Sequence, residues 1–356
     1  MTPLEIDGCK VVFGGGSFAE LDGYLSENAA RISKTVILCD TNSHEYCLPL
    51  MAENLPALTD YEIIEVEPGE ENKNLDTCRS LWEALSDMHA DRRTLMINLG
   101  GGVVCDMGGF TASCYMRGID FINVPTTLLS QVDASVGGKT GVDLGGLKNI
   151  VGLFSLPRMV VVNPLFIQSL PQKEVLSGFA EMIKHGLIRD RRHWEELSSR
   201  ADFSLQDTGR LVYDSVKIKY DVVLEDPTEK GLRKTLNFGH TIGHAVETFL
   251  MGSENPISHG HAVAIGMVCE TWLSSKLKGL DGSFPAKFKE YVKGLYGNDV
   301  NISTEDIPHI ISIMRHDKKN TARGINFTLL EDIGRSTIDN YVPEEEISEA
   351  VRFYGK

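Results

Sequence analysis

TLMINLGGGVVCDMGG, residues 94–109, joins an apolar run to two groups of glycines. The apolar run predicts a buried strand, and the glycines at 100–102 predict a tight turn that opens into a helix. Glycine at such a turn lets the backbone approach a bound anion closely, with helix N–H groups facing it. This stretch therefore predicts a strand–turn–helix unit of an α/β sheet.

The same alternation extends through the first half of the chain. Short runs rich in Val and Ile, bounded by Gly, Pro or Asp, predict strands at 9–13, 35–40, 61–67, 94–100, 121–125 and 159–163. Helical patterns lie between several of these runs, for example at 18–32 and 76–90. Strand–helix alternation of this kind predicts a largely parallel sheet that is covered by helices.

The second half of the chain shows helical periodicity and few strand signals. Helices are expected at 174–188, 208–223, 239–250 and 261–278. A chain of 356 residues exceeds the size at which one hydrophobic core stops growing, so two domains are expected. We place the boundary near PQKE (171–174), which gives domains of residues 1–173 and 174–356.

Charge and cysteine content limit the class of protein. A formal charge of −15 argues against a general nucleic-acid binder, although a few cations in a cleft can still bind a small anionic substrate. Seven cysteines without a CxxC pair indicate reduced thiols in a cytoplasmic protein. The amino terminus shows no signal peptide, and no apolar run approaches the roughly 20 residues that span a bilayer. We therefore expect no membrane partner.

Two glycine clusters are candidates for a dinucleotide site. GGGSFA (14–19) fits G-x-G-x-x-A, and Asp40 ends the next strand, where a ribose-binding acid would fall. The second cluster, at 100–109, is followed by the hydroxyl-rich PTTLLSQVDASVGGKTGVD (125–143), a composition expected of loops over a polar ligand. A tight turn without a ligand is the alternative for each cluster, and Asp40 alone is more typical of a helix cap or a turn residue.

Histidine is concentrated in one part of the second half. LNFGHTIGHAVE (236–247) places His240 and His244 on one helical face, and His259 and His261 follow shortly afterwards. Imidazoles suit Zn²⁺, Co²⁺ or Fe²⁺, and a catalytic site needs three protein ligands and an open position. Glu181 is the best acidic candidate, although any one of these histidines could instead cap a helix or lie satisfied in the core.

Cations recur within or beside these motifs in a chain that is acidic overall. Each one alone is typical of a solvated surface charge, but together they indicate a substrate with more than one anionic group, such as phosphate and carboxylate. They are Lys139, Lys148, Lys184, Lys219, Arg233 and Lys318.

Eight blocks in order give the chain a family resemblance over essentially its whole length. They are PGEENK (68–73), GGGVVCDMGGFTASCYMRG (100–118), VPTTLLSQVDASVGGKTGVD (124–143), LKNIVGLF (147–154), GFAEMIKHGLI (178–188), GLRKTLNFGHTIGHAVE (231–247), HGHAVAIGM (259–267) and HDKKN (316–320). The chain resembles the 3-dehydroquinate synthase family of sugar-phosphate cyclases. The resemblance implies a Rossmann-like α/β domain with a mainly parallel sheet, an all-α carboxyl-terminal domain, bound NAD, and one Zn²⁺ or Co²⁺ per subunit of a homodimer.

The resemblance also implies roles for residues by their motif positions. The metal ligands fall on Glu181, His240 and His259, with His244 a non-ligand. The NAD contacts fall on Asp40, Glu70, Lys73, Gly101, Gly102, Val103, Asp106, Thr126, Thr127, Asp133, Lys139 and Lys148. The substrate pocket falls on Asp133, Lys139, Asn149, Lys184, Lys219, Arg233, Asn237, His244 and Lys318, with Arg117 from a neighbouring subunit. His261 stands where the family often has Glu.

The implied reaction is a phosphate-releasing lyase reaction in the shikimate pathway. It converts 3-deoxy-D-arabino-heptulosonate 7-phosphate to 3-dehydroquinate by transient NAD-dependent oxidation, phosphate elimination, re-reduction and intramolecular aldol cyclisation. His244 and Lys184 would position hydroxyls or handle protons. The alternatives are a related cyclase of the aminocyclitol type, a glycerol-type metal-dependent dehydrogenase, and a non-catalytic protein that retains the fold.

Overall fold

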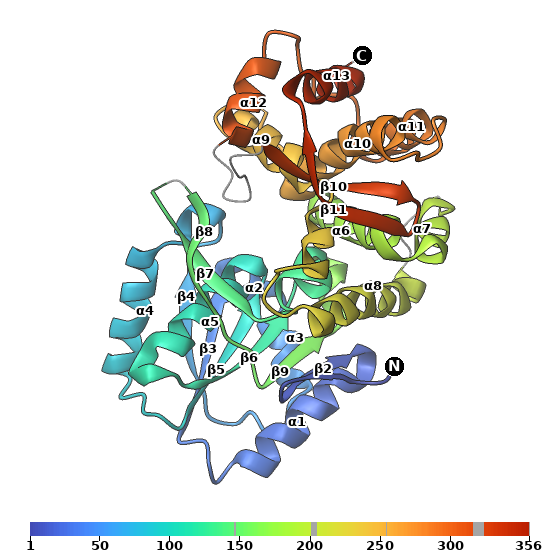
Figure 1. The fold of residues 1–356 in the computed structure, drawn as a ribbon. Helices are drawn as coiled ribbons and strands as arrows, with labels where there is room; N and C mark the ends of the chain where they lie inside the picture. Colours follow the sequence, from blue (N-terminus) through green and yellow to red (C-terminus); the bar gives the residue numbers. More distant parts are fainter. Residues whose placement is uncertain (146, 201–204, 254, 316–323, 356) are drawn as a thin grey trace. The chain divides into compact units, whose positions relative to one another are not determined.

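The computed structural model describes residues 1–145, 147–200, 205–253, 255–315 and 324–355 (Figure 1). The chain forms two compact units, and it passes between them after Pro171, again before helix α8 (Leu205–Glu225), and once more within α8 after Tyr220. The part of α8 up to Tyr220 packs with the first unit, although it lies in the expected second domain. A single boundary along the chain therefore does not describe how α8 is shared.

The first unit contains the predicted parallel sheet. Its strand order is β1-β2-β9-β6-β5-β3-β4, and every neighbouring pair is parallel except β1 with β2. The strands are β1 (Leu4–Ile6), β2 (Cys9–Phe13), β3 (Lys34–Asp40), β4 (Glu62–Val66), β5 (Thr94–Gly100), β6 (Asp120–Pro125) and β9 (Met159–Val162). The expected mainly parallel sheet is confirmed.

Strand β5 explains why one stretch of sequence decides this fold. All of its residues are buried, because alternate side chains enter two different cores. Ile97 packs on one face with α1 (Ser17–Asn28) and α3 (Leu48–Glu53), and Met96 packs on the other with α4 (Leu75–Asp87) and α5 (Gly102–Cys114). A strand covered on both faces needs the uninterrupted apolar run that the sequence shows.

Glycines let α5 lie unusually close to the sheet. A methyl group added at Gly108 would collide with Asn98 of β5 and would lie 2.9 Å from Leu38 of β3. One added at Gly109 would lie 2.6 Å from Cγ2 of Thr140. The second group of glycines in the deciding stretch is therefore needed for packing.

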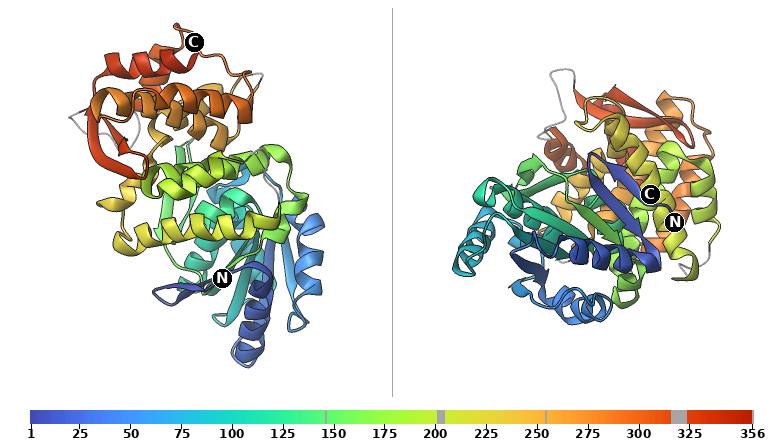
Figure 2. Two further views of the ribbon diagram at one scale, coloured as in Figure 1. Left: turned by 90° about the vertical axis from the view of Figure 1, so that its right-hand side faces the viewer. Right: turned by 90° about the horizontal axis from the view of Figure 1, so that it is seen from below.

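The second unit is mainly helical, as expected (Figure 2). Helix α10 packs against α6, α9, α11 and α13. The helices are α6 (Gln172–Arg189), α7 (Arg191–Ser198), α9 (His240–Leu250), α10 (His259–Leu277), α11 (Phe284–Tyr296), α12 (Ile307–Arg315) and α13 (Glu344–Gly355). None of the helices in the described part of the chain combines the length and the apolar character that a bilayer crossing requires.

Two hairpins differ from the expected pattern. In the second unit, β10 (Ile325–Asp332) pairs antiparallel with β11 (Arg335–Val342), so this unit is not wholly α-helical. β11 is polar and largely half-exposed, which hides the apolar alternation that would predict a strand. In the first unit, residues expected only as loops form β7 (Lys139–Leu144), which pairs with β8 (Leu147–Phe154).

Candidate active site

The glycine turn after β5 lies at the point where the sheet reverses its strand order. From β3 the chain continues outward to β4, whereas from β5 it continues in the opposite direction to β6. Ligands of open α/β sheets bind outside the carboxyl ends of the strands at such a point. Gly101 caps α5 without any side-chain hydrogen bond, so the first N–H groups of this helix face outward unsatisfied by a capping side chain. These N–H groups suit a pyrophosphate.

Close packing restricts the same turn. A methyl group added at Gly101 would lie 3.2 Å from Cγ2 of Thr127, and one added at Gly102 would lie 3.3 Å from Cβ of Ala134. Thr126 donates its N–H to the Gly100 carbonyl at 2.9 Å, which joins the loop after β6 to the turn. Val103 is half-buried in the first turn of α5. Both loops thus lie together at the carboxyl edge of the sheet.

Asp40 ends β3 beside this turn, but its carboxylate has a structural partner. It accepts a hydrogen bond from the Ser43 N–H at 2.7 Å and completes a capping box at the start of α2 (Thr41–Tyr46). The first glycine cluster lies elsewhere, in a 3₁₀ turn after β2 (Gly14–Gly16), where Gly14 has φ +69°. Its geometry is that of a tight turn near the outer strand β1.

A cluster of charged side chains that form ion pairs lies beside α5. Lys73 is only 3% exposed, and its Nζ lies 2.6 Å from Asp106 Oδ2 and 3.9 Å from Glu70 Oε1. Burial opposes the charged ammonium, but the carboxylates of Asp106 and Glu70 outweigh that effect and raise the Lys73 pKa. Lys148 lies 4.0 Å from Glu70. Four of the predicted cofactor residues therefore form one charged cluster.

The hydroxyl-rich loop after β6 is held by its own side chains. The Thr127 and Ser130 hydroxyl oxygens lie 2.9 Å apart, and the chain then makes a π-helical turn at Ser130–Ala134. Asp133 in that turn accepts a hydrogen bond from Lys219 Nζ at 2.7 Å. Lys219 belongs to the part of α8 that packs with the first unit. The structure thus joins two predicted pocket residues directly.

The remaining predicted residues of the first unit are exposed. Lys139 and Asn149 lie on the β7–β8 hairpin, where Asn149 has φ +52° and donates its N–H to Asp143 Oδ1 at 2.7 Å. Arg117 lies in a 3₁₀ turn (Tyr115–Arg117) after α5, with φ +69°. Lys318 lies outside the described residues.

Glycine contacts draw three helices of the second unit together. A methyl group at Gly260 of α10 would lie 2.6 Å from the carbonyl carbon of Ser177 in α6. One at Gly266 would collide with the Gly239 carbonyl oxygen at the start of α9, and one at Gly243 would lie 2.9 Å from the Ala262 oxygen. Helix α6 carries Glu181, α9 carries His240 and His244, and α10 begins at His259.

These helices place Glu181 among imidazoles. Its Oε1 lies 3.4 Å from His240 Nε2 and 4.0 Å from His259 Nε2. The carboxylate is completely buried, is ion-paired with Lys184, and accepts no hydrogen bond from the described residues. Burial removes the water that would otherwise bind these carboxylate oxygens, so the carboxylate has acceptor capacity left for a further partner. The donor set of one carboxylate and two imidazole nitrogens fits a divalent ion such as Zn²⁺ or Co²⁺.

A second set of ligands shares two of these residues. Ring nitrogens of His240, His244 and His259 lie within 4.8 Å of one another. His240 Nδ1 lies 3.1 Å from the Phe238 carbonyl oxygen, which leaves its Nε2 for a metal. The assignment of Glu181, His240 and His259 as ligands, with His244 as a non-ligand, therefore stays a prediction.

The other predicted residues of the second unit have defined partners. Arg233 is 2% exposed and donates from Nη1 to the Pro227 carbonyl at 2.6 Å. Asn237 donates to Glu229 Oε1 at 2.9 Å. His261 stacks on Tyr296, with ring centroids 4.8 Å apart, and burial lowers its pKa to about 4. In the described structure, His261 is not part of the imidazole group of His240, His244 and His259.

Two glutamates beside the histidine cluster were not predicted from the sequence. Glu247 Oε2 lies 3.0 Å from His259 Nδ1, and Glu270 accepts the Gly239 N–H at 2.6 Å and the Ile242 N–H at 3.3 Å. Glu247 follows His240 by seven positions, so helical spacing could have placed it on the same face. The only signal for Glu270 is an acid within the long apolar pattern of α10, where it is completely buried.

Comparison with known proteins finds relatives over nearly the whole chain. The model of the 3-dehydroquinate synthase N-terminal domain matches residues 63–177, and that of the C-terminal domain matches residues 178–320. A 3-dehydroquinate synthase of Parabacteroides distasonis is 43% identical over 347 residues, covering 97% of each chain. One from Thermoanaerobacter pseudethanolicus is 38% identical, covering 96% of each chain.

Solved structures with the same fold include related cyclases. A 2-deoxy-scyllo-inosose synthase complexed with carbaglucose-6-phosphate, NAD⁺ and Co²⁺ is 25% identical, with a TM-score of 0.87 over 99% of this chain and 100% of that one. A 2-epi-5-epi-valiolone synthase of Streptomyces hygroscopicus with NAD⁺ and Zn²⁺ bound has the same fold, with a TM-score of 0.82 over 99% of this chain and 98% of that one, at 21% identity. The chain belongs to the 3-dehydroquinate synthase family.

Proposed function

We propose that this chain converts 3-deoxy-D-arabino-heptulosonate 7-phosphate to 3-dehydroquinate and inorganic phosphate, with NAD and one divalent metal ion. Relatives that carry the name of this enzyme match it over nearly their whole length. The observation that carries the proposal is the buried Glu181 carboxylate, which faces His240 and His259 as a metal-binding donor set would. Burying a carboxylate whose oxygens accept no hydrogen bond in the described part of the chain costs stability, and a bound metal ion would offset that cost.

The glycine turn of the first unit would hold NAD. The N–H groups at the start of α5 would bind the pyrophosphate, because no side chain caps them. Lys73 and Asp106 would line one side of that site, where Lys73 is buried and Asp106 is half-buried. The cofactor contacts would be Asp40, Glu70, Lys73, Gly101, Gly102, Val103, Asp106, Thr126, Thr127, Asp133, Lys139 and Lys148.

When bound, NAD supplies a reversible hydride acceptor and the metal supplies a Lewis acid for substrate oxygens. Glu181, His240 and His259 would hold the metal. Lys184 is buried beside Glu181, where its ammonium would orient an oxygen of the substrate or donate a proton to it. His244 has its ring centroid 5.1 Å from that of His240, so its imidazole would take or return a proton next to the metal.

Cationic and amide side chains would bind the two anionic ends of the substrate. The carboxylate would be bound by Lys219, Arg233 and Asn237, and the phosphate by Lys139, Asn149 and Lys318. Lys219 and Arg233 are both buried and each already donates to an oxygen, of Asp133 and Pro227 respectively. These contacts fix the direction of the two cations before the substrate binds, which reduces the entropy cost of binding.

We further propose a cytoplasmic homodimer. The β7–β8 hairpin exposes Leu144, Leu147, Ile150, Leu153 and Phe154, and Phe154 is 61% exposed. An exposed apolar group of this kind is typical of a contact surface, and Arg117 would reach the site of the neighbouring subunit. All seven cysteines are free thiols, which supports a reducing compartment.

The test is release of phosphate from the heptulosonate phosphate by the purified protein, with and without a chelator. We expect release that stops with the chelator, returns with Zn²⁺ or Co²⁺, and leaves no net NADH. A hexose 6-phosphate is the control substrate for the related cyclases, and simple polyols are the control for dehydrogenases. Activity that survives the chelator would overturn the metal role, and net NADH from polyols would favour a dehydrogenase.

A further inference from the structure

We infer that Glu247 is a positioning residue for the metal site, acting through His259. This inference rests on the proposed metal site and adds a residue that the proposed function does not use. Glu247 lies on α9, and His259 is the first residue of α10. Glu247 Oε2 lies 3.0 Å from His259 Nδ1, which is hydrogen-bond distance.

The contact selects one tautomer of the His259 ring. A neutral imidazole carries its hydrogen on one nitrogen only, and a carboxylate is only an acceptor. Glu247 therefore holds the hydrogen on Nδ1 and leaves the lone pair of Nε2 free. That nitrogen is the one that lies 4.0 Å from Glu181 Oε1. The same carboxylate thus fixes both the orientation of the ring and the nitrogen that can bind a metal.

The two predicted histidine ligands are held in different ways. His240 Nδ1 lies 3.1 Å from the Phe238 carbonyl oxygen, so backbone geometry fixes its tautomer. His259 depends on a charged side chain instead, and it lies at the end of its helix, where no earlier helical turn packs against its ring. Glu247 is only 9% exposed, so solvent screens this contact little.

Substitution of Glu247 should weaken metal binding without removing a ligand. Replacing an acceptor behind a histidine ligand typically costs about 10- to 100-fold in metal affinity. Glu247→Gln keeps the shape of the side chain but loses its charge, and its amide can also donate to Nδ1 and favour the wrong tautomer. We therefore expect a loss of about tenfold for Glu247→Gln and a larger loss for Glu247→Ala.

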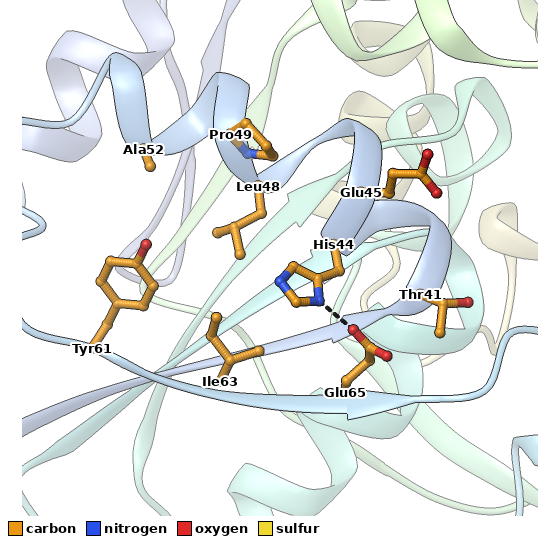
Figure 3. A pocket seen from close by; sticks show the side chains of 9 residues that line it. All are labelled: Thr41, His44, Glu45, Leu48, Pro49, Ala52, Tyr61, Ile63 and Glu65. Carbon is orange, nitrogen blue, oxygen red and sulfur yellow. Dashed lines mark hydrogen bonds and ion pairs between the residues drawn. The ribbon is translucent and has the colours of Figure 1, made fainter.

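The chain offers a matched control in its first unit. There, His44 Nδ1 contacts Glu65 Oε2 in a surface groove that is also lined by Leu48, Tyr61 and Ile63 (Figure 3). This is the same pair of side-chain atoms, with no second imidazole beside it among the described groove residues. Glu65→Gln removes a His–Glu contact of equal chemistry and should leave metal affinity unchanged.

The experiment is a titration of the full-length, metal-free protein with Co²⁺, followed by visible absorption. Zn²⁺ affinity is measured by competition with a chromophoric chelator. We expect one ion per chain for wild type and Glu65→Gln, and the stated losses for the two Glu247 variants. Failure of the wild type to bind would contradict the proposed function, whereas equal affinity of wild type and Glu247→Gln would contradict only the role of Glu247.

Ring ¹⁵N shifts of His259 in the metal-free wild type provide a readout that a merely structural role would not change. We expect the tautomer with hydrogen on Nδ1 in the wild type and a mixture in Glu247→Gln. This measurement decides the question even if Glu247→Ala does not fold. A wild-type ring with its hydrogen on Nε2 would overturn the inference.

Discussion

The glycine turn after β5 and the histidine cluster on α9 and α10 both depend on glycine, but for different reasons. In the turn after β5, glycines keep a proposed backbone site open, because the groups proposed to bind the pyrophosphate are the N–H groups of α5. In the second unit, glycines bring helices into contact so that side chains meet: Gly266 against Gly239, and Gly260 against Ser177. A site made from backbone should tolerate small substitutions better than one made from buried side chains.

The largest effect should come from the centre of the side-chain site. Glu181→Gln keeps the volume of a fully buried group but removes its charge and leaves Lys184 with a neutral neighbour. We expect Co²⁺ affinity and phosphate release to fall by more than about 100-fold, beyond the loss expected for a residue behind a ligand. The measurements are Co²⁺ titration and steady-state phosphate release.

Circular dichroism and urea unfolding serve as the controls for Glu181→Gln. Unchanged metal affinity in a folded Glu181→Gln protein would assign the metal to His240, His244 and His259 instead.

The next largest effect tests the contact between helices. Gly266→Ala puts a methyl group against the Gly239 carbonyl oxygen and 2.7 Å from the Gly243 nitrogen, and neither backbone atom can move easily. We expect a loss of about 3 kcal/mol in the free energy of unfolding, as for an overpacked core. Urea denaturation measures it.

Gly294→Ala is the matched control for Gly266→Ala. Gly294 also lies inside a helix, α11, but an added methyl group there has no atom within 4 Å. Alanine should therefore stabilise the protein by about 0.5–1 kcal/mol. A loss of equal size at both positions would show that glycine contacts do not hold α9 and α10 together.

A third prediction concerns pH. Burial lowers the pKa of His261 to about 4, so below the ordinary imidazole pKa of 6.5 the unfolded chain binds a proton that the folded chain does not. Stability should therefore decrease as pH falls from about 6.5 toward 4, by about 2 kcal/mol at pH 5 from this group. His261→Phe keeps a ring against Tyr296 and should remove that part of the pH dependence in urea unfolding. The same pH dependence of the unfolding free energy in wild type and His261→Phe would contradict this prediction.

Sequence patterns predicted the first unit better than the second for a physical reason. A strand such as β5 is buried on both faces, so its whole apolar run is visible locally, and Gly100–Gly102 follow it directly. In the second unit, the candidate ligands were found through their residue types and a family resemblance, because helix pairing depends on contacts far apart in sequence. Glu270 illustrates this: it binds the Gly239 N–H, 31 residues away.

The features that were not predicted from the sequence lack a clear local pattern of apolar and polar residues, with one exception. The β10–β11 hairpin escaped prediction because β11 carries polar, half-exposed residues. The division of α8 at Tyr220 has no local signal, since a helix shared by two packing units keeps one periodicity throughout. Glu247 was within reach, because its spacing from His240 and His244 already placed the three side chains on one face of α9.

The smallest effect is expected at the backbone site, and it gives the most direct test of the comparison. Gly101 has φ −71°, which alanine adopts without strain, and the added methyl group would meet only the Thr127 side chain, at 3.2 Å from Cγ2 and 3.7 Å from Oγ1. Gly101→Ala should therefore fold with a stability within about 1 kcal/mol of wild type, because a single methyl contact at a turn costs little.

NAD affinity, measured by calorimetry, should fall by about tenfold, since the methyl group separates the pyrophosphate from the N–H groups of α5. Co²⁺ affinity should not change, because the proposed ligands lie on α6, α9 and α10. If Gly101→Ala lost stability as Gly266→Ala does, the glycine turn after β5 would serve packing as the glycines of α9 and α10 do, and the distinction between a backbone site and a side-chain site would not hold.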